Sequence, residues 1–291
     1  LNEDADVIIC GRSSDAVLFA APLLNAQYSP AISYYAGKVL ECGSFCAEPF
    51  MGMESVLGRI EDDAIYLTAL HPEQRCTPLS VAGHAMYERI SPLREYVAGG
   101  YVDMSACHYE QIDEKTTRVT GATFVRDDVY KVKLEGAARV GERRLFVLGI
   151  RDPSTIERID QAIALAKGKV TERFGPIGED FDVFYHVYGR NGVMRELDPS
   201  PPKHPYELGL VVEVIAQTAE AAEEICAMAA RSLFFMHLPG IKGTAGAAAL
   251  MSDEILIGRA GYQWTLNHVM AVDDPYELFP TTYVDVNSAS N

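Results

Sequence analysis

The sequence predicts an α/β N-terminal portion with an antiparallel β meander, followed by an α+β domain whose elements run strand, helix, strand, strand, helix, strand. Three observations predict this organisation. Hydrophobic residues make up 48% of the 291 residues, which is enough to bury two cores of ordinary size. Short strands follow one another after residue 99, and the second half returns to longer strands and helices. We therefore expect domains at residues 1–140 and 141–291.

The N-terminal portion opens on an apolar run at residues 5–10, which predicts a buried strand. Gly11 ends this strand, and Ser13 or Ser14 can cap the helix that follows. The chain starts at Leu1 and enters the strand almost at once. We therefore expect the first domain to be N-terminally incomplete.

Two further helices begin where a hydroxyl residue precedes proline. Ser29 precedes Pro30, and apolar residues then recur at helical spacing as far as residue 40. Thr77 precedes Pro78 in the same way and predicts a third helix that reaches residue 90. Between these helices, the apolar run at residues 64–70 predicts a strand.

The pattern changes to consecutive strands after two glycines at residues 99–100. The predicted strands cover residues 101–104, 107–112, 117–125 and 129–134. Acidic and basic residues at 113–115 and 126–128 form the turns between the last three. Because short turns join neighbouring strands in antiparallel fashion, we expect one antiparallel meander.

The second half has a regular order. Strands are predicted at residues 144–150, 181–188, 208–215 and 262–272. Asp152 caps a helix after the first strand, and Thr218 caps a helix after the third. This βαββαβ order is typical of a ferredoxin-like α+β domain, in which both helices cover one face of an antiparallel sheet.

Charge and cysteine usage limit the partners and the compartment. The chain has 41 acidic residues against 25 lysines and arginines, a formal net charge of −16. This charge repels phosphate backbones, so it argues against nucleic acid and against anionic membrane surfaces as partners. No apolar run approaches the roughly 18 residues that a membrane span needs. The six cysteines show no paired spacing, which is typical of reduced thiols in a cytoplasmic protein.

The turn between the predicted first strand and first helix is the best candidate for a binding loop. Backbone N–H groups at a helix N-terminus attract anions, and an arginine there adds a charged donor. A second arginine, Arg151, precedes another helix in the same way. The predicted substrate-binding or anion-binding residues are Gly11, Arg12, Ser13, Ser14, Asp15 and Arg151. The alternative interpretation is that this turn only connects the strand to the helix and binds no ligand.

Two residues are candidates for a catalytic base. Glu41 lies at the end of the second predicted helix, and His84 lies within the third. Carboxylates and imidazoles are the side chains that most often take up protons in catalysis. Packing of His84 against a neighbour is the alternative for that residue. The loop residues His71, Glu73 and Arg75 follow a strand and are further polar candidates.

Five stretches resemble the acyclic terpene utilisation proteins of the AtuA type, and they occur in the order found in that family. They are ADVIICGRSSD at 5–15, VLECG at 39–43, VKLEG at 132–136, GIRDP at 149–153 and WTLNHV at 264–269. The resemblance implies catabolism of branched isoprenoid acids, such as those derived from citronellol and geraniol, with intermediates carried as coenzyme A thioesters. Family members also carry a glycine-rich portion ahead of the position of Leu1. The resemblance supplies neither a catalytic residue nor a cofactor.

Two classes of function follow. In the first, the protein acts on an acyl-CoA thioester or a branched carboxylic acid as a lyase or hydratase, by hydration, dehydration or carbon–carbon cleavage through an enolate. Glu41 or His84 would be the base, and Arg12 would hold the carboxylate or oxyanion together with the N–H groups after Gly11. In the second, the chain is a non-catalytic partner or scaffold subunit, or a homo-oligomer, in an assembly. Metal-assisted hydrolysis by His71, Glu73 and His84 is a third alternative, disfavoured because these residues lack tight ligand spacing.

Overall fold

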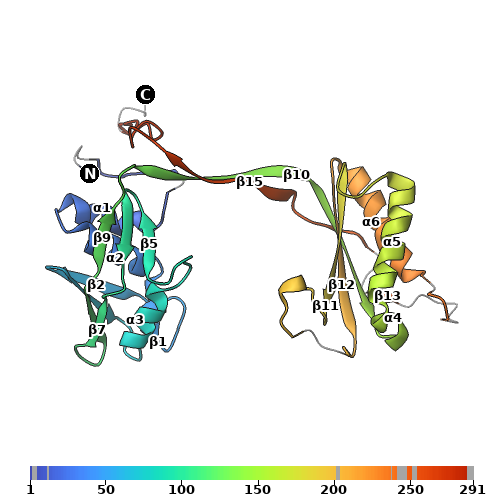
Figure 1. Cartoon of the computed structure of the whole chain (residues 1–291), viewed down its shortest axis with the longest axis horizontal. Coiled ribbons are helices and arrows are strands. Elements are labelled where there is room, and N and C mark those ends of the chain that lie inside the picture. Colours follow the sequence, from blue (N-terminus) through green and yellow to red (C-terminus); the bar gives the residue numbers. More distant parts are fainter. Residues whose placement is uncertain are drawn as a thin grey trace. The chain divides into compact units, whose positions relative to one another are not determined.

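The computed structural model of the chain describes residues 1, 5–11, 13–200, 204–236, 238–240, 248–250 and 254–286. Contacts divide the chain into two compact units (Figure 1). Unit 1 comprises Leu1–Lys133 and Val269–Asn291, and unit 2 comprises Leu134–His268. Each unit has a hydrophobic core of its own. The domain boundary between residues 140 and 141 stays a prediction.

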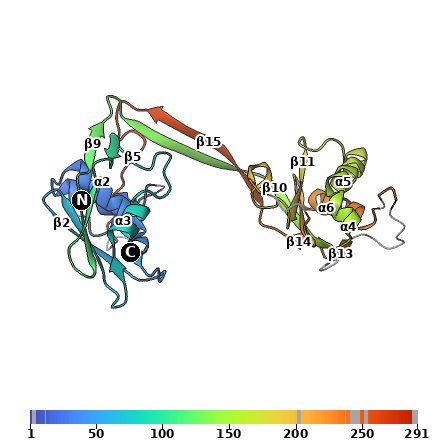
Figure 2. The same cartoon turned by 60° about the horizontal axis from the view of Figure 1, so that its bottom comes forward.

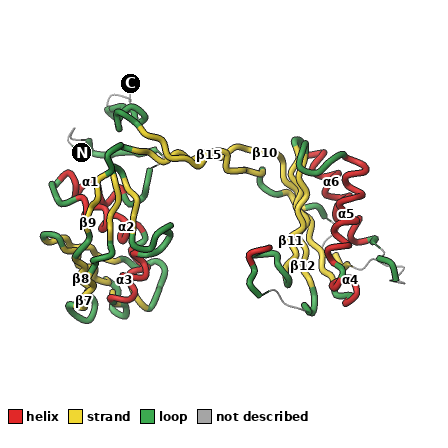
Figure 3. Tube along the Cα trace, viewed as in Figure 1, coloured by secondary structure: helices red, strands yellow, loops and turns green. Residues whose placement is uncertain are grey.

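Unit 1 combines helices with antiparallel sheets, as the sequence predicts for this part of the chain. The sheets have the strand orders β2-β3-β8-β7, β5-β6-β9 and β1-β4. Figure 3 shows helices and strands in separate colours. The elements are α1 (Val17–Asn25), α2 (Pro30–Glu41), η1 (Gly43–Cys46), β1 (Ala47–Glu48), β2 (Val56–Glu61), β3 (Ala64–Ala69), β4 (Arg75–Cys76), α3 (Pro78–Ala85), β5 (Arg94–Val97), β6 (Gly100–Asp103), β7 (His108–Gln111), β8 (Thr116–Thr120) and β9 (Thr123–Arg126).

The predicted opening strand is wrong. Residues 5–10 form no strand and are exposed, with Val7 at 76% and Ile9 at 91% relative exposure. An apolar run becomes a strand only where another strand pairs with it, and no described strand pairs with this one. Ser13 and Ser14 do not cap α1 either, because its N-cap is Ala16 and no side chain bonds there.

The predicted single meander is also wrong, since its strands divide between two sheets. β8 pairs with β3 and β7, whereas β9 pairs with β6. Gly121 lies between β8 and β9 with a φ of +87°, and a Cβ there would collide with the carbonyl oxygen of Ala106. Glycine therefore allows the chain to leave one sheet and enter the other.

The two proline-led helices are confirmed, although the second is shorter than predicted. Ser29 caps α2 by accepting a hydrogen bond from the N–H of Ile32 at 3.4 Å, with Pro30 in the first turn. α3 starts at Pro78 as predicted but ends at Ala85 rather than at residue 90. The unit 1 core lies between these helices and the sheets. It includes Tyr35, Val39, Ile65, Leu67 and Val81.

Unit 2 has a sheet with the order β11-β12-β10-β13. Each neighbouring pair of strands in this order is antiparallel. β14 and β15 also pair with β10. The strand predicted at residues 262–272 is present as β15, but it is not the fourth strand of this order as expected, because β13 takes the place next to β10. The elements are β10 (Lys131–Ile150), which begins in unit 1, α4 (Pro153–Glu157), α5 (Ile159–Phe174), β11 (Phe181–Tyr188), η2 (Arg195–Leu197), β12 (Leu208–Ala216), α6 (Ala219–Phe234), β13 (Ala248–Leu250), β14 (Leu256–Ile257) and β15 (Gly261–Ala271).

Helices α5 and α6 lie on one side of the unit 2 sheet (Figures 1 and 3). Alternate residues of each strand, such as Leu148, Val183 and Leu210, join the helices in the core. The predicted caps are confirmed: Asp152 accepts a bond from the N–H of Thr155 at 2.7 Å, and Thr218 caps α6. None of the described helices has the length and apolar character that crossing a bilayer requires.

Candidate functional site

The two predicted catalytic residues lie near the same lysine in unit 1. α2 carries Lys38 and Glu41, α3 carries His84, and the two helices are in contact (Figure 2). Lys38 Nζ lies 2.5 Å from Glu41 Oε1 and 4.0 Å from Glu88 Oε2. The Lys38 and Glu41 side chains are only 9% and 13% exposed, so solvent screens their attraction weakly.

His84 is buried against two aromatic rings, Phe45 and Tyr87, whose own centroids lie 6.1 Å apart. Its ring centroid lies 5.7 Å from that of Phe45 and 6.0 Å from that of Tyr87, with nearly parallel planes. Nε2 of His84 is buried and has no hydrogen-bond partner among the described residues. Burial, and then the charge of Lys38, lowers the pKa of His84 below its ordinary 6.5. The imidazole is therefore neutral at neutral pH and can accept a proton.

A second charged pair lies in the same electrostatic network. Arg89 Nε lies 3.2 Å from Glu95 Oε2, and the Arg89 side chain is 2% exposed. Burial raises the pKa of Glu95, while Arg89 and Lys38 oppose that shift. Burial also lowers the pKa of Arg89. The charges of Lys38 and Glu41 on α2 therefore also affect the pKa of Glu95 on β5.

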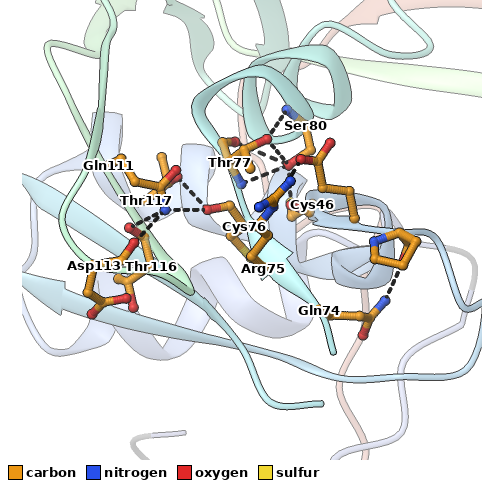
Figure 4. Close-up of polar contacts among 12 residues, drawn as sticks. Cys46, Gln74, Arg75, Cys76, Thr77, Ser80, Gln111, Asp113, Thr116 and Thr117 are labelled. Atoms are coloured by element: carbon orange, nitrogen blue, oxygen red, sulfur yellow. Dashed lines mark hydrogen bonds and ion pairs between the residues drawn. The ribbon is translucent and has the colours of Figure 1, made fainter. Parts of the chain in front are cut away.

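Hydrogen bonds around the start of α3 fix the position of His84. Thr77 and Ser80 form a reciprocal capping box, and Ser80 Oγ also donates to the carbonyl oxygen of Cys46 at 2.7 Å (Figure 4). This bond ties α3 to η1, which carries Phe45. The ring of Phe45 is thereby held against the imidazole of His84.

The short strand β4 is held by side chains of the neighbouring sheet. Gln111 Nε2 and Thr117 Oγ1 both donate to the carbonyl oxygen of Cys76, at 3.0 and 2.8 Å (Figure 4). Burial raises the pKa of Cys76 to about 12, and it raises the pKa of Cys46 further. Both thiols therefore stay protonated and serve packing rather than nucleophilic attack.

The predicted anion-binding residues do not join this cluster in any described contact. Gly11, Ser13, Ser14 and Asp15 are exposed ahead of α1. Arg12 lies outside the described residues. Arg151 belongs to unit 2, where its guanidinium carbon lies 3.5 Å from the ring centroid of Tyr206. The role of these residues in anion binding stays a prediction.

The loop after β3 offers no metal centre. The N–H of Glu73 donates to His71 Nδ1, and Arg75 pairs with Glu48 at 3.4 Å. Across the part of the chain that the structure describes, no three His, Cys, Asp or Glu side chains gather as metal ligands. The arrangement therefore gives no support to metal-assisted hydrolysis by His71, Glu73 and His84.

The sequence analysis did not identify Lys38, Arg89 and Glu95 as members of the cluster. Lys38 had a readable signal, because it precedes Glu41 by three residues and so shares its helix face. Arg89 and Glu95 had no such signal. They come from a turn and from β5, and only the fold brings them into the network.

Comparison with protein families gives one match. The family model described as acyclic terpene utilisation family protein AtuA matches residues 1–257. No curated protein and no solved structure matches the chain.

Proposed function

Because the chain belongs to the AtuA family of acyclic terpene utilisation proteins, we propose that it acts on a branched carboxylic acid or its acyl-CoA thioester. The proposed reaction is hydration, dehydration or carbon–carbon cleavage. All three proceed through an enol or enolate, so they require a base next to a group that stabilises negative charge.

The observation that carries this proposal is the buried, unpartnered Nε2 of His84 beside the Lys38–Glu41 pair. In the proposed step, His84 Nε2 takes a proton from the carbon next to the substrate carbonyl, and the electron pair moves to the carbonyl oxygen. The Lys38 ammonium stabilises that oxygen, and Glu41 orients Lys38. In dehydration, the electron pair returns from the oxygen to form the carbon–carbon double bond, the β-hydroxyl takes the proton held by His84 and leaves as water, and hydration is the reverse.

Two aromatic rings suit the acyl chain. Phe45 and Tyr87 contact His84 and each other, and they are 48% and 46% exposed, so an apolar chain can lie on them next to the imidazole. Arg12 and the N–H groups after Gly11 are proposed to bind the carboxylate or the thioester head. Arg151 lies in unit 2 and is proposed as an anion contact of that unit alone.

Deuterium exchange tests this proposal without requiring knowledge of the final product. The full chain is incubated with 3-hydroxy-3-methylbutanoyl-CoA in D₂O, and mass spectrometry follows deuterium uptake at the carbon next to the carbonyl and loss of water. We expect His84→Gln and Glu41→Gln to lower the rate by about a hundredfold, the lower range for loss of an acid or base. Glu88→Gln is the matched control, because its side chain is 62% exposed and lies only at the edge of the Lys38 site. Wild-type rates in both folded variants would remove the cluster from the mechanism.

A non-catalytic role as a partner subunit is the second candidate. It is favoured by β15, where alternate residues Tyr262, Trp264 and Leu266 are 67%, 66% and 44% exposed. Exposed apolar rows of this kind often mark contacts between proteins. Thermal-shift measurements with coenzyme A, acyl thioesters and small carboxylic acids discriminate the two candidates, because a ligand stabilises the state that binds it. A flat response at millimolar ligand supports the partner role.

We also propose that the second domain, predicted at residues 141–291, is ferredoxin-like. The order of its main elements and the strand order β11-β12-β10-β13 support this assignment. An experimental structure of the full chain tests it. A strand other than β13 in the edge position next to β10 would contradict it.

A further inference from the structure

Unit 2 holds a second polar cluster, on the face of its sheet opposite the helices. His186 on β11, Glu213 on β12 and Arg143 on β10 alternate with core residues of the same strands. Since neighbouring residues of a strand point to opposite faces, all three side chains point away from α5 and α6. The segment between β11 and β12, which contains η2, lies on this side of the sheet (Figures 1 and 3).

The three side chains form a chain of polar contacts across adjacent strands. His186 Nε2 lies 2.7 Å from Glu213 Oε2, and Arg143 Nη1 lies 3.4 Å from Glu213 Oε1. His186 and Glu213 are only 19% and 18% exposed. Because the carboxylate accepts from Nε2–H, it fixes the orientation of the imidazole. In this tautomer Nδ1 carries the lone pair of the ring, and it has no hydrogen-bond partner in the described part of the chain.

A cavity of about 230 Å³ adjoins this cluster. The cavity lies at the edge strand β11, where His186 lines it together with Asn191, Arg195 and Glu196 of the following segment, and Lys167 of α5 lines it from the helix side of that edge. Its walls are mainly polar. Two cations therefore line the cavity against one carboxylate, in a chain whose net charge is −16. Arg195 has no ion-pair partner among the described residues, so its charge is available.

A second cavity of about 290 Å³ shares Asn191 and Gly192 with the first. Its lining is more apolar and includes Tyr188, Val193 and Met194. A polar and an apolar compartment thus adjoin each other. Such a pair fits a small molecule with an anionic head and a short aliphatic tail.

Local packing holds the segment that forms both cavities. The N–H of Asn191 donates to the carbonyl oxygen of Val187 at 3.2 Å. A Cβ on Gly192 would come within 2.8 Å of the backbone of Val187, so glycine permits this close approach. Arg190 pairs with Asp160 of α5 at 2.7 Å. These contacts therefore fix the start of the segment, at residues 190–192, where it leaves β11.

From these contacts we infer that unit 2 binds a short aliphatic carboxylate between β11 and the segment that carries η2. The carboxylate group binds the cations Lys167 and Arg195 beside the ring of His186, and the aliphatic tail lies against Tyr188, Val193 and Met194. This site is separate from the Lys38, Glu41 and His84 cluster and does not depend on the function proposed for it.

The test is a titration of the full chain, with ¹⁵N-labelled histidine, by sodium 3-methylbutanoate, acetate or inorganic phosphate. We expect 3-methylbutanoate to shift the Nδ1 resonance of His186 in a saturable way, and to bind at least fivefold more tightly than acetate. Arg195→Gln and Lys167→Gln should each weaken binding at least fivefold. Lys169→Gln, on the same helix but outside the cavity lining, is the matched control and should leave binding unchanged.

Three results would overturn the inference. The first is no shift of the His186 resonance at tens of millimolar 3-methylbutanoate. In the second, phosphate binds as tightly as the carboxylates, which would indicate a general anion site. In the third, Lys169→Gln weakens binding as much as Lys167→Gln, which would indicate an effect of net charge alone. Met194→Ser gives an independent check, because it should reduce the preference for 3-methylbutanoate over acetate while leaving acetate binding intact.

Discussion

Burial determines the chemistry of single side chains in the Lys38, Glu41 and His84 cluster. An imidazole in water has ample hydrogen-bond partners, whereas His84 packs against two aromatic rings and its Nε2 is unpaired among the described residues. Burial penalises its charged form, and the nearby Lys38 adds to that penalty. The same residue type in unit 2, His186, instead donates from Nε2 to the carboxylate of Glu213 at 2.7 Å. Two histidines of one chain are thus suited to different tasks by their neighbours.

The lowered pKa of His84 predicts how stability depends on pH. Between the folded pKa and the ordinary 6.5, the unfolded chain binds more protons at this residue, so stability rises with pH and is lost as pH falls through that window. Glu95 acts in the opposite sense, because its raised pKa makes stability fall as pH rises above 4.5. We expect His84→Gln to abolish the rise of stability with pH that His84 causes. We expect Glu95→Gln to abolish the fall of stability with pH that Glu95 causes. Urea unfolding from pH 5 to 7, with NMR titration of His84, measures both. A His84 pKa at or above 6.5 would contradict this account.

Ser80 is expected to be the hydroxyl on which the position of α3 depends. Ser80→Ala removes the bond to the carbonyl oxygen of Cys46 and the capping bond to the N–H of Thr77. Loss of a cap and of a buried partner should cost about 1–2 kcal/mol. Denaturant unfolding followed in unit 1 measures this loss. Ser55→Ala is the control, because Ser55 is exposed and should change stability by less than about 0.5 kcal/mol.

Elements with a local signal could be predicted from the sequence. Ser29 with Pro30, Thr77 with Pro78, and Asp152 with Pro153 start helices where the structure has them. β11 spans residues 181–188 as predicted, because its alternating pattern is bounded by clear turns. Residues 5–10 have an equally apolar pattern and form no strand. A strand forms only where a second segment pairs with it, and the composition of one segment does not show whether such a partner is present.

In the candidate site too, residues with a local sequence signal could be predicted, and residues brought together only by the fold could not. Glu41 and His84 were identified from polar residues in otherwise apolar helices, and the fold places both near Lys38. Arg89 and Glu95 could not be predicted, because their pairing depends on where a turn and a β-strand meet. The Glu213–His186 contact was also missed. Its two residues lie 27 positions apart and meet only through the register of β11 with β12.

Two glycines in helices should respond in opposite ways to alanine. A Cβ on Gly37 of α2 would lie 2.5 Å from the carbonyl oxygen of Ala16, at the contact with α1, so Gly37→Ala should force the helices apart and lower stability by about 1–3 kcal/mol. Gly83 of α3 has open space around it, and Gly83→Ala should raise stability by up to about 1 kcal/mol through helix propensity alone. Thermal unfolding compares the two. Stabilisation by both substitutions would show that α1 does not pack closely on Gly37.

At the scale of the whole molecule, charge and core organisation have separate consequences. The net charge of −16 opposes anionic ligands in general, so each proposed anion site must rely on local cations, such as Lys38 in unit 1 or Lys167 and Arg195 in unit 2. Stability, in contrast, comes from two hydrophobic cores that share no residue. A substitution that destabilises one core therefore need not destabilise the other.

Cavity-forming substitutions in each core test whether the units unfold independently. Leu67 in unit 1 and Leu210 in unit 2 are both fully buried, so replacing either by alanine should cost about 2–5 kcal/mol. If each core is a cooperative unit, Leu67→Ala lowers the melting temperature of one calorimetric transition and Leu210→Ala that of another, and hydrogen exchange quickens only within the altered unit. Leu79→Ala is the control, because Leu79 is 80% exposed and its loss leaves no cavity. A single transition that both core variants lower equally would mean that β10, which runs from unit 1 into unit 2, couples the cores into one cooperative fold.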